Sequence, residues 1–270
     1  MDNEKVNSGQ AAIRLENVAI GYGGRPLFRP FSLEIEKGTF TVVIGANGSG
    51  KSTLLHTIGG TLAPVGGKVF IDGTDIRDLS GRQLARRLGL VYTERMAAGG
   101  LTVRELVEMG RHPYTGCLGR LSAKDRVQVD HAMNLTGIKE KSECFLSEIS
   151  DGERQKAMVA RAIAQETPIM ILDEPTNFLD AASRIETLSL VRNLVRDNGM
   201  TVLLSTHDTG VALEMADNVL TVLPRDEVNP VSVDKLESEQ AVRRLKTVFF
   251  DRGIVYDPER KDFVCHKAES

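Results

Sequence analysis

Cysteine is scarce in this chain, and the long apolar runs of membrane proteins are missing. Its 270 residues include three cysteines, with no C-x-x-C spacing and no paired framework, which favours a reducing, cytosolic compartment. No apolar run approaches the roughly 18 residues that a membrane helix needs. The first residues are polar and acidic, and they lack the basic start and the apolar stretch of a signal peptide. If the protein works at a membrane, we expect it to dock onto another protein that spans it.

The chain also lacks an excess of basic residues. Its formal net charge is −3, which does not favour nucleic acid as a partner, because nucleic acid requires a basic face. The hydrophobic content of 41% and the charged content of 26% are ordinary for a soluble globular protein. The length allows one large α/β domain or two modest ones.

Strands and helices alternate along most of the sequence. Short apolar or alternating stretches predict strands at 13–20, 31–36, 39–44, 68–71, 88–93, 168–172, 201–205 and 218–223. Helices are expected at 52–58, 80–87, 181–197 and 208–215. This rhythm predicts an α/β fold with a parallel sheet covered on both faces.

Two stretches depart from the alternation. Between about 96 and 166 the pattern is helical, and the pairs Thr102–Glu105 and Ser122–Asp125 are typical of helix starts, so a helical insertion is expected. After Pro224 the chain is polar to Gln240. A helix over 241–250 and a hairpin of 254–256 with 262–265 are expected to follow.

The segment GANGSGKS, residues 45–52, matches the pattern G-x-x-x-x-G-K-[ST]. Glycines allow backbone N–H groups to approach phosphate closely, and the following helix directs its positive end at the anion. Lys51 adds a point charge, and Ser52 offers a hydroxyl to Mg²⁺. The pattern lies between a predicted strand and a predicted helix, so it predicts an ATP–Mg²⁺ site. The predicted nucleotide ligands are Asn47, Gly48, Ser49, Gly50, Lys51, Ser52 and Thr53.

A second set of candidates follows the strand at 168–172. Asp173 and Glu174 stand at its carboxyl end, which is the ligand edge of a parallel sheet. Asp173 is expected to hold Mg²⁺, and Glu174 to polarise a water molecule as general base. Acidic residues are also common at strand ends without any function. The functional interpretation of this pair therefore depends on the phosphate loop found upstream in the same chain.

These segments, together with further ones in matching order, resemble the ATPase subunits of ABC transporters. Tyr22 resembles the aromatic residue that stacks on adenine, although a lone Tyr after a strand more often packs. ISDGERQ, residues 149–155, resembles the family's signature, and Ser150 with Glu153 also forms a helix-start pattern. Residues 177–180, ending in Asp180, resemble the D-loop, and 205–208 resemble the segment that carries the switch histidine, here His207. The resemblance spans about residues 13 to 223.

The resemblance implies the fold of the ABC ATPases: a P-loop NTPase with a mainly parallel core sheet, an antiparallel β subdomain and a helical subdomain. The expected ATPase domain covers 12–224, with the helical subdomain at about 96–166 and a C-terminal extension at 225–270. Two copies are expected to pack head to tail, so that Ser150 and Gly152 of one copy bind the γ-phosphate of ATP held by the other. Glu174 and His207 would then position the attacking water.

The implied partners are two transmembrane permease subunits and, indirectly, an extracytoplasmic substrate-binding protein, with the chain peripheral on the cytoplasmic face of the membrane. GRHPYTGCLGRLSAKDR, residues 110–126, and YDPE, residues 256–259, resemble importers of iron-siderophores, haem and cobalamin. One alternative is a soluble ABC-type ATPase of DNA repair or translation, which usually carries two such domains or a coiled-coil insertion. Another is a module that holds ATP without turnover, which Glu174 and His207 disfavour. The sequence does not name the cargo.

Two departures from the family pattern matter for the site. Glu94 stands where a Gln that contacts Mg²⁺ is usual; a carboxylate is still a hard oxygen ligand, so we expect Glu94 to keep the metal role with altered tuning. Asp151 and Glu153 stand where Gly and Gln are common. Two carboxylates would repel a phosphate, so both side chains are expected to point away from it.

Overall fold

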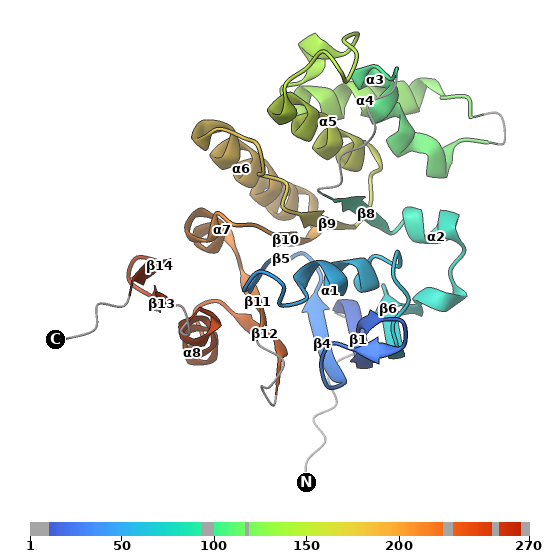
Figure 1. Ribbon diagram of the computed structural model, residues 1–270. Coiled ribbons are helices and arrows are strands. Elements are labelled where there is room, and N and C mark those ends of the chain that lie inside the picture. Colours follow the sequence, from blue (N-terminus) through green and yellow to red (C-terminus); the bar gives the residue numbers. More distant parts are fainter. Residues whose placement is uncertain (1–10, 93–99, 117–118, 224–228, 250–253, 266–270) are drawn as a thin grey trace. The chain divides into compact units, whose positions relative to one another are not determined.

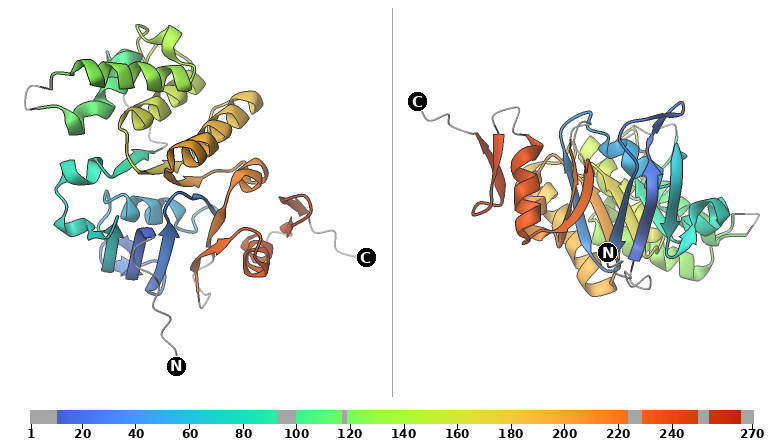
Figure 2. Two further views of the ribbon diagram at one scale, coloured as in Figure 1. Left: turned by 180° about the vertical axis from the view of Figure 1, so that it is seen from behind. Right: turned by 90° about the horizontal axis from the view of Figure 1, so that it is seen from below.

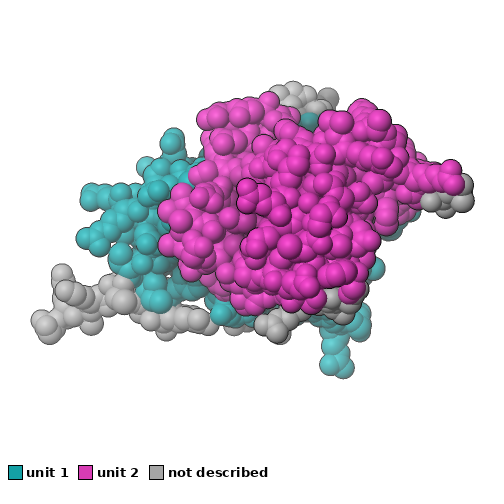
Figure 3. Space-filling view, turned by 90° about the horizontal axis from the view of Figure 1, so that it is seen from above, with its two compact units in different colours: residues 1–79, 209–270 teal, residues 80–208 magenta. Residues whose placement is uncertain are grey.

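The computed structural model describes residues 11–92, 100–116, 119–223, 229–249 and 254–265 (Figure 1, Figure 2). The chain forms two compact units, which Figure 3 shows in separate colours. Unit 1 consists of Met1–Leu79 and Thr209–Ser270, and unit 2 of Ser80–Asp208. The predicted domain boundaries follow a different division and stay a prediction.

Unit 1 contains an antiparallel sheet in the order β4 (Phe31–Glu36), β1 (Ala11–Ala19), β6 (Gly66–Ile71) and β7 (Thr74–Asp75). Its strands form because apolar and polar residues alternate; on β4, every second residue from Phe31 is buried. A short hairpin of β2 (Gly21–Tyr22) and β3 (Arg25–Pro26) follows β1. The antiparallel subdomain that the resemblance implied is thereby confirmed.

Two further strands of unit 1 are buried along their whole length. β5 (Phe40–Gly45) and β11 (Asn218–Val222) pair in parallel, and every residue of both is buried. Such continuous apolar strands need cover. Contacts with β5 come from α1 (Lys51–Ile58), α7 (Thr209–Met215) and α8 (Glu239–Val248). β12 (Val231–Lys235) is antiparallel to β11.

The C-terminal part of unit 1 ends in a hairpin of β13 (Ile254–Asp257) and β14 (Asp262–Cys265). α8 lies between this hairpin and the strands β11 and β12 (Figure 1, Figure 2). Phe263 packs its ring at 4.8 Å from that of Phe249 and at 5.5 Å from that of Tyr256. The predicted helix and hairpin are confirmed, and the helix begins earlier because Ser238 caps it.

Unit 2 has its own parallel strands, in the order β10 (Thr201–Ser205), β9 (Ile169–Asp173) and β8 (Leu88–Val91). α6 (Ala181–Asn198) contacts β10, and α5 (Asp151–Ala164) contacts β8. α6 ends at Gly199, which adopts the left-handed conformation with φ 65°; glycine adopts it without steric penalty. The prediction that these strands pair in parallel is confirmed.

The helical part of unit 2 follows the predicted starts. Capping boxes at Ser80, Thr102 and Ser122 open α2 (Gly81–Ala85), α3 (Val103–Glu108) and α4 (Ala123–Leu135). Between α3 and α4, the 3-10 helix η2 (Met109–Tyr114) carries Arg111, whose side chain is 3% exposed and pairs with Asp125. α3, α4, α5 and η2 pack on one another.

Two further expectations differ from the structure. No strand was expected between 224 and 240, yet β12 forms there; four of its five residues are not fully buried, so no apolar run reveals it. The strand predicted at 88–93 ends at Val91, and Thr93 lies outside the described residues.

Candidate functional site: a phosphate loop and a carboxylate–histidine pair

The phosphate loop lies in unit 1, between β5 and α1. Gly48 has φ 75° and Gly50 has φ 103°, values that glycine adopts readily. A Cβ on Gly45 would lie 2.6 Å from the carbonyl oxygen of Val222, and one on Gly50 would lie 3.0 Å from the ring of Phe28. Both positions therefore exclude a larger residue, which explains why the loop is rich in glycine.

The start of α1 suits an anion. Gly50 is its N-cap, and no side chain among the described residues caps it through a hydrogen bond, so the first N–H groups keep their capacity to bind phosphate. The Nζ of Lys51 donates to the carbonyl oxygens of Gly45 at 2.8 Å and Ala46 at 3.2 Å. The Oγ of Ser49 is buried and meets no hydrogen-bond partner in the described part of the chain. Buried hydroxyls are normally satisfied, so this atom fits a site for a polar ligand.

Tyr22 reaches the same helix from the β2–β3 hairpin. Its hydroxyl lies 3.2 Å from the Oγ1 of Thr53, and 58% of the residue is exposed. An aromatic ring held at its hydroxyl and open on its faces can stack on a flat base. Unit 1 thus brings Tyr22 together with the loop.

In unit 2, the carboxyl end of β9 carries the predicted acidic residues. Asp173 is buried and accepts a hydrogen bond from the hydroxyl of Ser205, its partner in the parallel register of β9 and β10. Glu174 has φ 53°, which is uncommon for a residue with a side chain. Its N–H donates to the carbonyl oxygen of Ser205 at 3.0 Å and to the hydroxyl at 3.1 Å. Ser205 therefore holds the carboxylate of Asp173 and the backbone of Glu174.

Glu174 is paired on both of its carboxylate oxygens. Its Oε1 lies 2.8 Å from the Nε2 of His207, and its Oε2 accepts from the Nδ2 of Asn177 at 2.5 Å. The side chain of Glu174 is 23% exposed and that of His207 is 54% exposed, so the pair is open to water. A carboxylate held in this way beside an imidazole can orient a water molecule and accept its proton.

The segment 149–155 opens α5 in unit 2. Ser150 is the N-cap, and its N–H and hydroxyl both donate to Glu153, at 2.9 and 3.0 Å. The Ser150 N–H is the main cause of a lowered pKa for Glu153, with Lys141 contributing from 3.4 Å. Asp151 is 2.5 Å from Arg154. Each acidic side chain is thus engaged within unit 2, and the expectation that both point away from a phosphate stays a prediction.

The segment 177–180 packs beside α5. A Cβ on Gly152 would lie 3.4 Å from both the Leu179 side chain and the Phe178 carbonyl oxygen. Asp180 caps α6 and accepts from the N–H of Ser183 at 2.9 Å, the main cause of its lowered pKa. Unit 2 thus brings together Asp173, Glu174 and His207, and links 149–155 to 177–180. Glu94 lies outside the described residues.

Two supports of the acidic pair are not expected from the sequence: Ser205, which holds Asp173, and Asn177, which contacts Glu174. A signal for Ser205 was its place at the end of the predicted strand 201–205, because the carboxyl ends of parallel strands meet at the same edge of a sheet, where Asp173 and Glu174 also lie. Asn177 carries no comparable signal, since its contact depends on the positive φ of Glu174.

A model of the ABC transporter family matches residues 28–177, more than half of the chain. The chain belongs to the ABC transporter family. It is 38% identical over 212 residues to the ferric enterobactin transport ATP-binding protein of Escherichia coli, covering 78% of each chain. It is 36% identical over 248 residues to the achromobactin transport ATP-binding protein of Dickeya dadantii, covering 92% of this chain and 91% of that one.

A third relative is the iron(3+)-hydroxamate import ATP-binding protein of Bacillus subtilis, 33% identical over 255 residues and covering 94% of each chain. Among solved structures, the fold matches a dimeric ATP-binding cassette with ADP and Pi, at a TM-score of 0.72 and 28% identity, covering 84% of this chain and 99% of that one. An inward-facing metal-chelate type ABC transporter matches at a TM-score of 0.73 and 25% identity, covering 89% of each chain. The expected fold and ABC ATPase function are confirmed, and transport is favoured over a soluble ABC-type ATPase.

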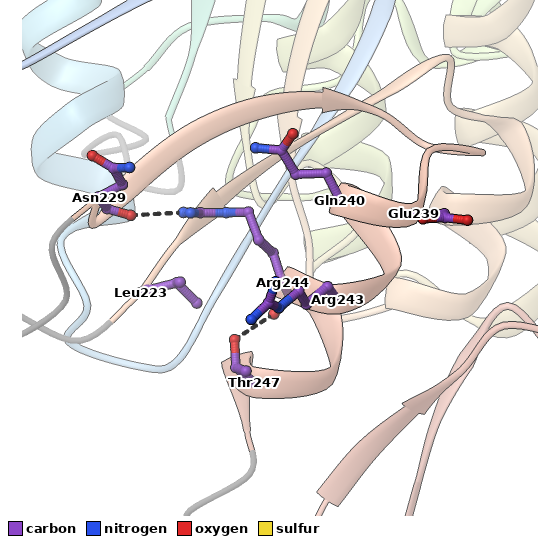
Figure 4. Close-up of a pocket in the computed structure, with 7 residues that line it drawn as sticks. All are labelled: Leu223, Asn229, Glu239, Gln240, Arg243, Arg244 and Thr247. Carbon is purple, nitrogen blue, oxygen red and sulfur yellow. Dashed lines mark hydrogen bonds between the residues drawn. The ribbon is translucent and has the colours of Figure 1, made fainter.

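Among the helices that the structure describes, none combines the length and apolar character needed to cross a membrane. A polar hollow of about 840 Å³ lies along α8 in unit 1 (Figure 4). None of the predicted site residues that the structure describes lines it. Its Arg244 donates to the Oγ1 of Thr221 at 2.6 Å and to the Asn229 carbonyl oxygen at 3.0 Å.

Proposed function

We propose that this ABC ATPase binds ATP with Mg²⁺ and hydrolyses it to energise import of an iron-siderophore, haem or cobalamin. The observation that carries the catalytic part is the Glu174–His207 pair, at 2.8 Å, next to buried Asp173. Relatives at 33–38% identity are named for the transport of achromobactin and ferric enterobactin and for the import of iron(3+)-hydroxamate, which supports the cargo class.

The phosphate loop holds the nucleotide in this proposal. The first N–H groups of α1 and the charge of Lys51 bind the phosphates, and the buried Ser49 hydroxyl, which has no partner in the described part of the chain, is available to them. Tyr22 stacks on the adenine. Ser52, Asp173 and Glu94 supply the hard oxygen ligands that Mg²⁺ prefers, and the bound ion offsets phosphate charge.

Glu174 acts as the general base. It orients the attacking water and takes its proton, while His207 steadies the carboxylate and faces the γ-phosphate. Asn177, on the second oxygen at 2.5 Å, restricts the carboxylate to one orientation. The three groups limit the motion of the water, which is how positioning accelerates the reaction.

The complete site is shared by two copies of the chain. Ser150, the Gly152 N–H and Asp180 of one copy act on the nucleotide of the other. This requires the Ser150 hydroxyl to turn from Glu153 toward phosphate, an exchange of one charged acceptor for another. The dimer joins two permease subunits on the cytoplasmic face of the membrane, which receive substrate from an extracytoplasmic binding protein.

The test compares Glu174→Gln with Lys51→Ala and with the control Glu186→Gln. The side chain of Glu186 is 70% exposed and lies 3.6 Å from Lys156. We expect Glu174→Gln to bind ATP but no longer to hydrolyse it, so that no phosphate is released. Lys51→Ala should lose ATP binding, and Glu186→Gln should bind and hydrolyse ATP as the parent does. Parental turnover in Glu174→Gln would refute the catalytic assignment.

A second experiment tests the proposed cargo class. Disruption of the gene should abolish cellular uptake of ferric siderophore, haem or cobalamin. Unchanged uptake of all three would refute the cargo class.

A further inference from the structure

Arg184, in the first turn of α6, donates to two separate segments of unit 2. Its Nε donates to the carbonyl oxygen of Leu179 at 2.9 Å, and its Nη1 donates to the carboxylate of Asp208 at 2.7 Å. Asp208 directly follows His207 in the chain. One guanidinium group therefore joins the segment 177–180 to the residue beside the histidine.

This arrangement differs from an ordinary surface ion pair. The side chains of Arg184 and Asp208 are 42% and 26% exposed, and a pair of that exposure contributes little by itself. The planar guanidinium, however, is fixed at two points in different directions, which determines its orientation. Moving either segment breaks one of its two hydrogen bonds.

Asp208 is also hydrogen-bonded to its neighbours in the chain. Its N–H donates to the Oγ1 of Thr206 at 3.1 Å, and that oxygen lies 2.9 Å from the Oγ1 of Thr176, with both threonines buried. The backbone on both sides of His207 is thereby held. The imidazole is half exposed, so its place opposite Glu174 depends on this backbone more than on packing.

The other end of the connection reaches the start of α5. Leu179 and Phe178 lie against Gly152, which belongs to the segment proposed to bind the partner's nucleotide. The φ of Phe178 is 68°. A shift at 177–180 is therefore transmitted through one side chain toward His207. We propose that Arg184 is a positioning residue that ties formation of the Glu174–His207 pair to the placement of residues 177–180. This inference rests on the proposed ATPase function.

The test is Arg184→Met, with Arg196→Met as a matched control on the same helix; Arg196 is exposed and bonded to Asp197 and Asn193. For Arg184→Met we expect kcat for ATP to fall about 10- to 100-fold, the scale of a misplaced catalytic group. ATP affinity should change less than about twofold, because the phosphate loop is untouched. Arg196→Met should retain parental kcat and affinity.

Two further variants separate positioning from general damage. Arg184→Met/Asp208→Ala should lose no more than the larger single loss, because both remove one connection. Arg184→Lys should restore only part of kcat, since one ammonium group cannot reproduce the fork. Equal falls in kcat and ATP affinity, additive losses, full rescue by lysine, or a parental kcat would each overturn the inference. If parental turnover survived Glu174→Gln, the proposed function itself would fail, which is a different result.

Discussion

Replacing Asp125 with alanine tests how much one buried carboxylate stabilises the helical part of unit 2. Its Oδ1 accepts from the Nε of Arg111 at 2.9 Å, and its Oδ2 accepts from the N–H and hydroxyl of Ser122 at 2.9 and 2.6 Å. The side chains of Arg111 and Asp125 are 3% and 10% exposed. Alanine at 125 removes half of the capping box of α4 and, at the same time, one partner of a buried cation.

The two losses have different sizes. Losing half of a capping box costs about 1 kcal/mol. Removing one partner of a buried ion pair costs about 3 kcal/mol, and Arg111 keeps its bonds to Ala164 at 2.6 Å and Glu166 at 2.7 Å, so we expect about 3 kcal/mol in all. Glu105→Ala is the matched control, because Glu105 closes the same box with Thr102 at 2.8 Å but is exposed. It should lose only about 1 kcal/mol.

The assay is equilibrium urea unfolding followed by circular dichroism. The midpoint of Asp125→Ala should lie about 1 M below that of Glu105→Ala, for a slope of about 2–3 kcal/mol per M. Equal midpoints for the two variants would refute the contribution of the Arg111 contact.

Acid provides a second readout. The Ser122 hydroxyl, followed by its N–H and Arg111, lowers the pKa of Asp125 although burial opposes the shift. A lowered folded pKa means that the stabilisation is complete above the unfolded value of about 3.9 and disappears as pH falls through the folded value. The gap between parent and Asp125→Ala should therefore narrow below about pH 4; a gap that stayed constant there would contradict the ionised pair.

Two other substitutions test separate parts of the chain. Gly210→Ala places a Cβ 3.0–3.1 Å from the carboxyl group of Asp262, so hydrogen exchange in β13 and β14 should accelerate, and adding Asp262→Ala should reverse the effect; unchanged exchange would show that the hairpin does not depend on this contact. Glu94→Gln should change both the Mg²⁺ dependence and the rate of ATP hydrolysis, because it removes a charge proposed to lie near metal and phosphate; identical titration curves would remove Glu94 from the metal site.

The helix starts could be predicted because their signals are local. At Ser80, Thr102, Ser122 and Ser150, each N-cap and its partner are three residues apart, and all four capping boxes form. β10 matches its predicted bounds for a similar reason, since its apolar run is bounded by turn residues. The signals for these features are therefore local in the sequence.

Long-range pairing could not be predicted in the same way. β12 has little apolar character and forms by pairing with β11. At the site, sequence placed Glu174 and His207 at neighbouring strand ends but could not find Asn177 or Arg184 as their supports. Those contacts depend on the positive φ values at Glu174 and Phe178, which residues with side chains adopt only when the surrounding structure enforces them.

The acidic residues at the start of α5 are unfavourable for binding a phosphate, but neighbouring basic side chains neutralise them. Asp151 and Glu153 add two negative charges where a phosphate is proposed to bind, but Arg154 lies 2.5 Å from the first and Lys141 lies 3.4 Å from the second. The charges of these four side chains cancel, so the helix terminus keeps its positive end. Only Arg154 stands near enough in sequence to be expected as a partner; Lys141 reaches Glu153 through the fold. An acidic signature segment therefore remains compatible with an anion because of a residue outside the segment.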